Sequence, residues 1–384
     1  MITIASVGLF VGFYASYCVI CLRYVRLKSP VDDFRFEEQK LPTVSFIVPV
    51  YNEAKIIHRK IRNIQQMNYP PDKLEVIFVD GGSEDGTVEQ LENLPENVSY
   101  SQKIVRQGTR KGFNSAVIEG FLQSTGEIIF ITGAETEYAP NAVRLIVDHF
   151  ANPKVGAVNG TMKISNLGEG TSTRIEASYR SFYDFIREAE SKIDSPFDIK
   201  GEIAATRRSL CQNIVGKVEI LRRGCIDACF SFQAAEEGYK TIYEPRAVYS
   251  EPAPGTMRDS FKQQIRRGAT LIENMLCYKN MILRPKYGKF GLIIMPAHFL
   301  MLVVLPFFFF ISIGGILLLT VLAPLNPFLI GVIVLGLLGL VFSREVQAFA
   351  KVQVVLIFIM FRILFGIDTQ KFERLSSVRP SREG

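Results

Sequence analysis

Three acidic residues stand at places in the sequence where side chains often meet a ligand. Glu53 follows a short apolar run that ends near Pro49, Asp80 closes a second run, and Glu135 comes shortly after a third. Carboxylates can accept hydrogen bonds, bind hard divalent cations or take up a proton. Whether these three act together depends on the elements that position them.

The acids are expected at the ends of strands in an α/β sheet. Strand-like runs alternate with helical patterns, which favours a mostly parallel sheet covered by helices. Ligands of such sheets bind outside the carboxyl ends of the strands, so Glu53, Asp80 and Glu135 should border one crevice. The predicted strands are 44–48, 74–79, 100–105 and 127–132, and the predicted helices are 53–67, 88–94 and 113–123.

The same sequence excludes several other classes of protein. A dinucleotide-binding dehydrogenase requires G-x-G-x-x-G after its first strand, whereas this chain has Pro49-Val-Tyr-Asn-Glu53. Cys18 and Cys21 form a C-x-x-C inside an apolar run, and the six cysteines and three histidines do not otherwise suggest a zinc site or a disulfide framework. The net charge of +6 is modest, and we expect no nucleic-acid partner.

Apolar sequence is concentrated at the two ends of the chain. Residues 2–22 carry no charge and are long enough to cross a bilayer. Residues 291–323 form a second such stretch, and the shorter runs 327–342 and 352–367 follow it. The last run contains Arg362 and is short for a span, so we expect it to lie shallow in the membrane or to re-enter it.

Basic residues predict that the middle of the chain is cytoplasmic, because positive charge marks the cytoplasmic ends of spans. A cleaved signal peptide is the alternative for the N-terminal run, but no basic region precedes that run. We therefore expect an integral protein of the cell membrane with its catalytic domain in the cytoplasm. The flanking charges are Arg23, Arg26 and Lys28 on one side, and Arg284, Lys286 and Lys289 on the other.

Five motifs in a fixed order make the segment 44–276 resemble the family 2 glycosyltransferases, which are inverting enzymes with a GT-A fold. The segment resembles in particular the membrane-bound group of hyaluronan, poly-N-acetylglucosamine and cellulose synthases. The motifs are P-V-Y-N-E from Pro49, D-G-G-S-E-D-G-T from Asp80, K-G-F-N from Lys111, G-A-E-T-E-Y-A-P from Gly133, and Asp227 followed by E-G-Y-K from Glu237.

The resemblance implies a role for each matched position. Asp80 would accept a hydrogen bond from a nucleobase, Glu135 would bind a divalent cation at the last acid of D-x-D, and Asp227 would be the general base. The further donor-binding candidates are Pro49, Tyr51, Glu53, Lys111, Gln263, Arg266 and Arg267, and the acceptor-side candidates are Gly201, Glu202 and Arg207.

Two positions depart from the family pattern. Gly81 replaces the second Asp of D-D-G-S, and Gly133 replaces the first Asp of D-x-D. The expected cation, Mg²⁺ or Mn²⁺, would then depend on Glu135, with Glu137 two residues further on. If the cation site is weakened, Arg266 and Arg267 would carry more of the phosphate charge.

We therefore predict an α/β protein, with a cytoplasmic GT-A domain built on a Rossmann-like, mostly parallel sheet, plus transmembrane helices. It would transfer a sugar, with inversion, from a UDP- or GDP-sugar to a membrane-associated acceptor, either lipid-linked or a growing glycan. The predicted divisions are an N-terminal transmembrane helix (1–28), the GT-A domain (42–257), an amphipathic interface helix region (258–289), a C-terminal transmembrane region (290–367) and a basic tail (368–384).

The alternative from another class is a catalytically degenerate membrane protein that keeps the GT-A fold as a binding or scaffolding module. Gly81 and Gly133 favour it. Single positions also have purely structural explanations: Asp80 as a turn residue, Asp227 as a helix cap, and the two arginines as lipid-binding residues. The combination of Asp227 with the arginine pair favours the enzyme, because a scaffold needs neither a base nor a clamp for a diphosphate.

Overall fold

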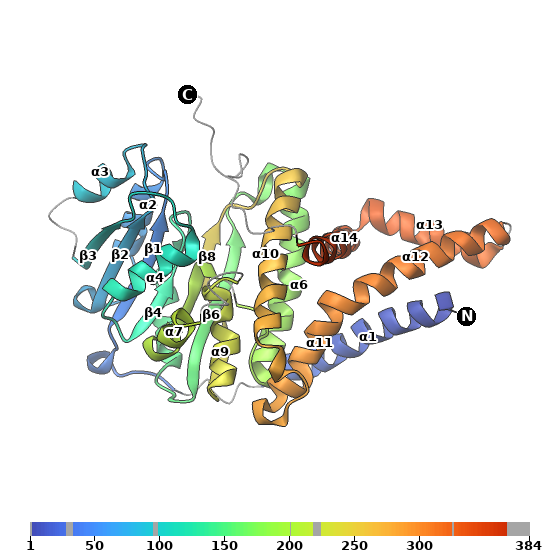
Figure 1. Cartoon of the computed structure of the whole chain (residues 1–384), viewed down its shortest axis with the longest axis horizontal. Helices are drawn as coiled ribbons and strands as arrows, with labels where there is room; N and C mark the ends of the chain where they lie inside the picture. The colour runs from blue at the N-terminus through green and yellow to red at the C-terminus, as the bar shows by residue number, and fades with distance from the viewer. Residues whose placement is uncertain are drawn as a thin grey trace.

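The computed structural model describes residues 2–27, 34–94, 99–199, 201–217, 224–324 and 326–366. A mixed sheet of eight strands forms the centre of the α/β domain, in the order β3-β2-β1-β4-β7-β6-β8-β5 (Figure 1). The strands are β1 Val44–Val50, β2 Leu74–Asp80, β3 Ser101–Arg106, β4 Ile128–Ile131, β5 Glu137–Tyr138, β6 Val155–Ile164, β7 Ala204–Arg207 and β8 Lys240–Glu251.

The central strands are parallel and buried on both faces, which explains their nearly continuous apolar sequences. β1 lies between β2 and β4 and pairs with both in parallel. Successive residues of β1 alternate between two hydrophobic cores: Phe46 and Val48 enter one, and Ile47 enters the other. The predicted α/β class and mostly parallel sheet are confirmed, although β7 runs antiparallel to its neighbours β4 and β6.

Helices cover both faces of this sheet. α4 shares one core with α7, α9 and α10, while α2 and α5 pack into the other. The helices of the α/β domain are α2 Ile57–Gln65, α3 Thr87–Glu92, α4 Phe113–Gln123, α5 Ala142–His149, α6 Thr171–Ile193, α7 Arg208–Val215, α9 Phe230–Glu236 and α10 Met257–Cys277.

One predicted helix starts later than expected. The pattern predicted a helix from Glu53, but α2 begins at Ile57. The backbone N–H groups of Glu53 and Ala54 are instead bonded to side chains of the next motif, Thr87 Oγ1 at 2.8 Å and Asp85 Oδ2 at 3.1 Å. These bonds hold the segment before α2 as a turn at the carboxyl end of β1.

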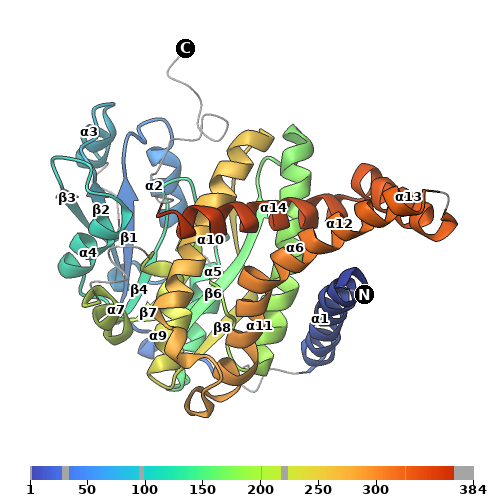
Figure 2. The same ribbon diagram turned by 45° about the vertical axis from the view of Figure 1, so that its right-hand side comes forward.

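The remaining helices extend away from the sheet. α1 and α12 run side by side, α13 follows α12, and α14 crosses α10 close to the α/β domain (Figures 1 and 2). The bounds are α1 Ile2–Val25, α11 Met295–Phe299, α12 Leu305–Leu322, α13 Pro327–Phe342 and α14 Arg344–Leu364. Short π-helical segments, Phe290–Ile294 and Leu300–Val304, precede α11 and α12.

Three helical segments are long and apolar enough to cross a membrane: 5–25, 290–322 and 344–364. α13 is also apolar but has only 16 residues. α14 packs against α10, where Cδ1 of Ile359 lies 2.7 Å from the position of a Cβ atom on Gly268. The predicted basic tail, 368–384, and Lys28 lie outside the described residues.

A buried polar cluster joins α1 and α11 to the α/β domain. Glu190, on α6, accepts hydrogen bonds from Tyr17 Oη at 2.5 Å and from the backbone N–H of Phe197 at 2.8 Å. Nε2 of His298, on α11, lies 2.6 Å from the same carboxylate. The ring of His298 also stacks on Phe197 with 4.0 Å between centroids. The apolar helices α1 and α11 are therefore attached to the sheet domain by specific contacts.

Candidate active site

Two turns at the carboxyl ends of β1 and β2 hold each other by hydrogen bonds. The backbone N–H of Asn52 donates to Ser83 Oγ, and Oδ1 of Asn52 accepts from the N–H of Glu84, both at 2.9 Å. Asn52 has a φ of +56°, a left-handed conformation that asparagine adopts more readily than most residues. The first two motifs therefore form one rigid edge, and Glu53 is buried within it.

Asp80 lies at this edge and shapes its own turn. Its carboxylate accepts the backbone N–H groups of Gly82 at 3.0 Å and Ser83 at 3.1 Å. A carboxylate oxygen has more than one acceptor site, so these bonds leave room for a base donor. Gly82 is required here because its φ is +85° and a Cβ atom would lie 2.8 Å from the carbonyl oxygen of Gly108.

The other predicted donor-side residues differ in burial and in contacts. Pro49 is half-buried at the end of β1, and the Tyr51 ring lies under the guanidinium of Arg110, 4.5 Å from its centroid. Lys111 is half-exposed, and its Nζ lies 3.2 Å from Oε1 of Glu119. Gln263 is buried on α10.

The loop after β4 carries the predicted cation ligand. The carboxylate of Glu135 folds back over Gly133, where a Cβ atom would lie 2.8 Å from Oε2 of Glu135. The longer Glu135 side chain therefore occupies the space that a side chain at position 133 would need. A single glutamate thus stands where the family pattern has two aspartates.

A second carboxylate faces the same region from β8. Glu251 is buried, its Oε2 has no hydrogen-bond partner within the described part of the chain, and its Oε1 lies 3.4 Å from Arg267. Burial and then the charge of Glu202 raise the pKa of Glu251 to about 8, and the charge of Glu135 contributes in the same direction.

The residues fit a cation that relies on its substrate for further ligands. Among the described residues, no group of three His, Cys, Asp or Glu residues is arranged to hold a metal ion. Glu135 and Glu251 nevertheless supply two carboxylates, one of them with an unsatisfied oxygen. Mg²⁺ commonly uses one or two carboxylates and completes its shell with substrate phosphates and water.

Asp227 lies where the chain returns to the site, directly before α9. Its carboxylate rests against the backbone of Gly201, so closely that a Cβ atom there would lie 1.5 Å from Oδ2 of Asp227. Burial raises the pKa of Asp227 above its usual range; a hydrogen bond from the Cys225 thiol lowers it, and the charge of Glu202 raises it further. The structure therefore brings the predicted base to two of the acceptor-side candidates, Gly201 and Glu202.

Two asparagines that sequence reasoning did not single out hold the segment before Asp227. Asn114, the last residue of K-G-F-N, donates to the carbonyl of Gly224 at 2.9 Å and accepts from the N–H of Ile226 at 3.2 Å. Asn274, on α10, accepts from the N–H of Cys225 at 3.1 Å. Asn114 belongs to a recognised motif, whereas nothing local in the sequence marks Asn274.

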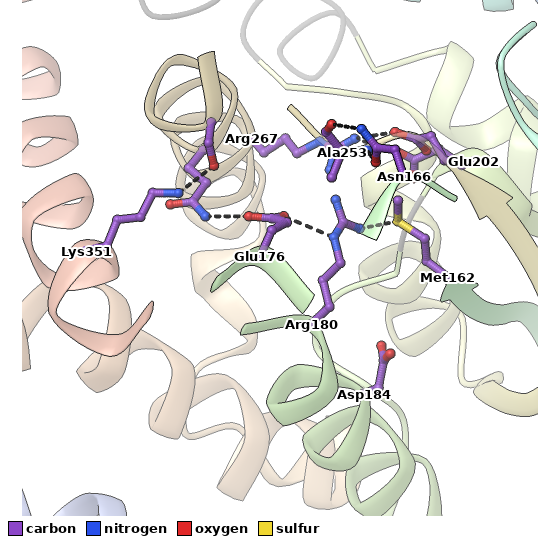
Figure 3. A network of polar contacts seen from close by, with 12 residues as sticks. Met162, Asn166, Glu176, Arg180, Asp184, Glu202, Ala253, Arg267 and Lys351 are labelled. Carbon is purple, nitrogen blue, oxygen red and sulfur yellow. Dashed lines mark hydrogen bonds and ion pairs between the residues drawn. The ribbon is translucent and has the colours of Figure 1, made fainter. Parts of the chain in front are cut away.

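The two arginines of α10 have different surroundings, and Figure 3 draws those of Arg267. Nη2 of Arg267 lies 2.6 Å from Oε1 of Glu202, so this guanidinium binds protein carboxylates, including Glu251. Arg266 lies within electrostatic reach of Asp227 and Glu202, and burial lowers its pKa. Arg267 thus connects α10 to the acceptor-side loop, and Arg266 stands beside the candidate base.

Arg207 is separated from the other acceptor-side candidates. β7 is antiparallel to β4 and pairs Arg207 with Ile128, at the start of that strand, so Arg207 lies at the opposite end of the sheet from the turns that follow β1 and β2. Its guanidinium donates to the backbone carbonyls of Phe150, Asn152 and Val155. Its position indicates a structural role.

The fold and the gathered carboxylates define the class of GT-A-fold proteins, and comparisons with known proteins agree. Residues 45–215 match the family model described as Glycosyl transferase family 2. The chain therefore carries a segment that matches the family 2 glycosyltransferase domain, as the motifs predicted.

Curated relatives match over part of their length. The chain is 26% identical to the probable glycosyltransferase YdaM of Bacillus subtilis over 63% of this chain and 58% of the relative. It is 25% identical to the poly-beta-1,6-N-acetyl-D-glucosamine synthase of Staphylococcus epidermidis over 60% of this chain and 55% of the relative. The matched region thus spans little more than half of each relative.

One solved structure matches over nearly the whole chain. It is a mannosyltransferase from Pyrobaculum calidifontis in complex with GDP-Man and Mn²⁺, with a TM-score of 0.81 and 26% sequence identity. The match covers 96% of this chain and 99% of the other. It therefore includes the apolar helices as well as the sheet, and it confirms the predicted fold.

Proposed function

We propose that the protein transfers a sugar from a nucleotide diphosphate-sugar to an acceptor at the membrane surface, with inversion at the anomeric carbon. The observation that carries the proposal is the position of Asp227. Its half-buried carboxylate lies against Gly201 and within electrostatic reach of Glu202 and Arg266. An acid with a raised pKa, at the meeting point of the acceptor-side loop and α10, is suited to remove a proton.

The proposed reaction is a single displacement. The Asp227 carboxylate takes the proton of the acceptor hydroxyl as that oxygen attacks the anomeric carbon. The bond from the anomeric carbon to the diphosphate breaks at the same time, and the nucleoside diphosphate leaves with the bonding electron pair. General base catalysis of this kind typically contributes about 10²- to 10⁴-fold to the rate.

The donor would lie along the edge formed by the first two turns. Asp80 would accept a hydrogen bond from the base, with Tyr51 and Glu53 beside it, and Arg266 would face the diphosphate. Glu135 and Glu251 would hold Mg²⁺ or Mn²⁺, which when bound offsets the negative charge that grows on the leaving diphosphate.

GDP-mannose is the first donor to test. The solved mannosyltransferase that matches nearly the whole chain is in complex with GDP-Man and Mn²⁺. The synthase relative, by its name, makes poly-N-acetylglucosamine, but it matches over a smaller share of both chains. We therefore rank GDP-mannose above a UDP-sugar as the donor.

A membrane-associated acceptor is supported by the packing of α10. This helix carries Arg266 and Arg267 and packs against α14, one of the three candidate spans. A lipid-linked acceptor or a glycan held at the bilayer would reach the site from that side. We propose accordingly that the protein is integral to the cell membrane and that its catalytic domain is cytoplasmic.

A donor screen tests the proposal. The full chain in detergent would be incubated with GDP-mannose, UDP-N-acetylglucosamine and UDP-glucose, with Mn²⁺, Mg²⁺ or excess chelator, and release of nucleoside diphosphate would be measured. One donor should be turned over, and Asp227→Asn should bind that donor but lower turnover by about 10²- to 10⁴-fold.

The scaffold alternative predicts a different result from the same screen. A degenerate GT-A module would bind a nucleotide-sugar, or none, and would release no diphosphate under any condition. Unchanged turnover in the Asp227→Asn variant would instead show that Asp227 caps a helix and that the base lies elsewhere.

A further inference from the structure

A fully buried lysine lies directly behind the loop that carries Glu135. Lys60, on α2, has no exposed surface. Its Nζ donates to Thr132 Oγ1 and to the backbone carbonyl of Thr136, each at 2.9 Å. These two acceptors lie on either side of Glu135, so one side chain joins the start and the end of the loop.

The lysine has no ion-pair partner to account for its burial. Within the described part of the chain it makes no salt bridge; Glu135 and Glu137 act on it only at longer range, and Nζ lies 4.7 Å from the centroid of the Tyr138 ring. Burying an amine is costly unless its hydrogen bonds are made. An apolar residue would fill the same space without that cost, so the contribution of Lys60 lies in its two hydrogen bonds.

These two bonds do not depend on the charge of the lysine. Burial lowers the pKa of Lys60 to about 7, against the opposing effect of Glu135 and Glu137. A neutral amine keeps two N–H donors, which is the number that Thr132 and Thr136 require. Lys60 can therefore hold the loop in either protonation form.

Asn63, one turn further along α2, fixes the end of the same segment. Its Nδ2 donates to the carbonyl of Tyr138, and its Oδ1 accepts from the N–H of Tyr138, both at 2.8 Å. The Tyr138 hydroxyl donates in turn to the carbonyl of Glu202 at 2.8 Å. Residues 132–138 are thus attached to α2 by four hydrogen bonds, two from Lys60 and two from Asn63.

We propose that Lys60 is a positioning residue that holds residues 132–138 in the cation-binding arrangement before a cation arrives. The inference rests on the proposed function, because it concerns the loop that would hold Mg²⁺ or Mn²⁺. With Gly133 in place of an acid, one long glutamate must reach the cation from this loop. When the loop is already ordered, the free energy of cation binding is not reduced by the entropy cost of ordering it.

The test is Lys60→Met in the full chain, which removes both donors while keeping an unbranched apolar side chain. Mn²⁺ binding would be followed by the electron paramagnetic resonance signal of free Mn²⁺, in the presence of GDP or UDP. The Mn²⁺ concentration for half-saturation should rise about tenfold, the scale of two ordinary hydrogen bonds. Saturating Mn²⁺ should restore nucleotide affinity to within about twofold of wild type, since the cation then orders the loop itself.

Hydrogen exchange gives a second measurement without cation or turnover. In metal-free Lys60→Met, the backbone amides of residues 132–138 should exchange about tenfold faster than in wild type, in proportion to the lost loop stability. Thr132→Val removes a single acceptor and should move both measurements in the same direction by a smaller factor. It also decides the question if the buried methionine prevents folding.

Lys103→Met is the matched control. Nζ of Lys103 also makes two bonds, to Glu75 at 2.7 Å and to the carbonyl of Gln123 at 2.8 Å, but at the opposite end of the sheet. This variant should leave the Mn²⁺ requirement and the exchange of residues 132–138 unchanged.

Three results would overturn the inference. They are an unchanged Mn²⁺ requirement in both Lys60→Met and Thr132→Val, a loss of nucleotide affinity that saturating Mn²⁺ does not restore, and an equal effect of Lys103→Met. If wild type turns over a donor while any of these holds, only the role of Lys60 fails. If wild type binds neither Mn²⁺ nor a nucleotide, the proposed function fails and the inference with it.

Discussion

Gly201→Ala should disable the enzyme by moving one carboxylate. A Cβ atom on Gly201 would lie 1.5 Å from Oδ2 of Asp227, and Cβ atoms essentially never approach other heavy atoms within 3.0 Å. The methyl group and the carboxylate must therefore separate by at least a further 1.5 Å (3.0 Å less 1.5 Å). A catalytic group misplaced by about 1 Å can cost about 10²-fold in rate. We expect kcat to fall by about 10²-fold or more.

The assay is diphosphate release by the full chain with saturating donor and acceptor, together with direct binding of the donor. Donor affinity should be preserved, because Gly201 and Asp227 lie on the acceptor side of the proposed site. Gly216→Ala is the control, since a Cβ atom there would meet nothing closer than 3.6 Å. A Gly201→Ala enzyme with wild-type kcat would refute the assignment of Asp227 as a base fixed against this loop.

Three further predictions follow from the site and the fold. Asp227 must be ionised to act as a base, and burial is the main cause that raises its pKa. The acid-side fall of kcat/KM should therefore occur at a pH above the pKa of an ordinary aspartate. Cys225→Ala removes a hydrogen bond that lowers the pKa of Asp227, so it should move this fall to higher pH. Glu135→Ala should raise the Mn²⁺ concentration for half-maximal activity by about tenfold or abolish activity. Adding Gly133→Asp to this variant should recover part of the loss, because the Glu135 carboxylate no longer occupies the space that a side chain at position 133 needs. Full activity in excess chelator would contradict both expectations. Cysteines placed between residues 28 and 289 should not react with a membrane-impermeant reagent applied to intact cells, and labelling from outside would reverse the proposed topology.

The first half of the sheet could be predicted because its strands are buried on both faces. β1, β2 and β4 appear in the sequence as short apolar runs, and the predicted 44–48, 74–79 and 127–132 lie within one or two residues of them. α6 gave no such signal. Its buried side chains include Glu176 and Arg180, which pair with each other at 3.0 Å, so an apolar stripe does not mark the buried face.

The site was predictable where a motif marks it and not where the chain reverses direction. Gly201, Glu202 and Arg207 are close in sequence, yet β7 carries Arg207 to the far end of the sheet. The sequence does mark Lys60, because this residue lies on the same face of α2 as Ile57, Ile61 and Ile64, where an apolar residue would be expected. A charged residue at such a position is expected to form hydrogen bonds with polar groups elsewhere in the fold.

The shared core of the sheet and the apolar helices has a practical consequence for the handling of this protein. One hydrophobic cluster contains Ile129 of the sheet, Ile359 of α14, and Phe290 from the π-helical segment before α11. Two of the partners of Glu190 are Tyr17 and His298. A fragment that ends before Phe290 would lose the helical part of this cluster and His298, and one that also lacks α1 would lose Tyr17. Each buried group left without its partner costs about 1–3 kcal/mol, out of a total stability of about 5–15 kcal/mol. The sheet domain is therefore not structurally independent of the apolar helices, and the two should be purified and assayed together.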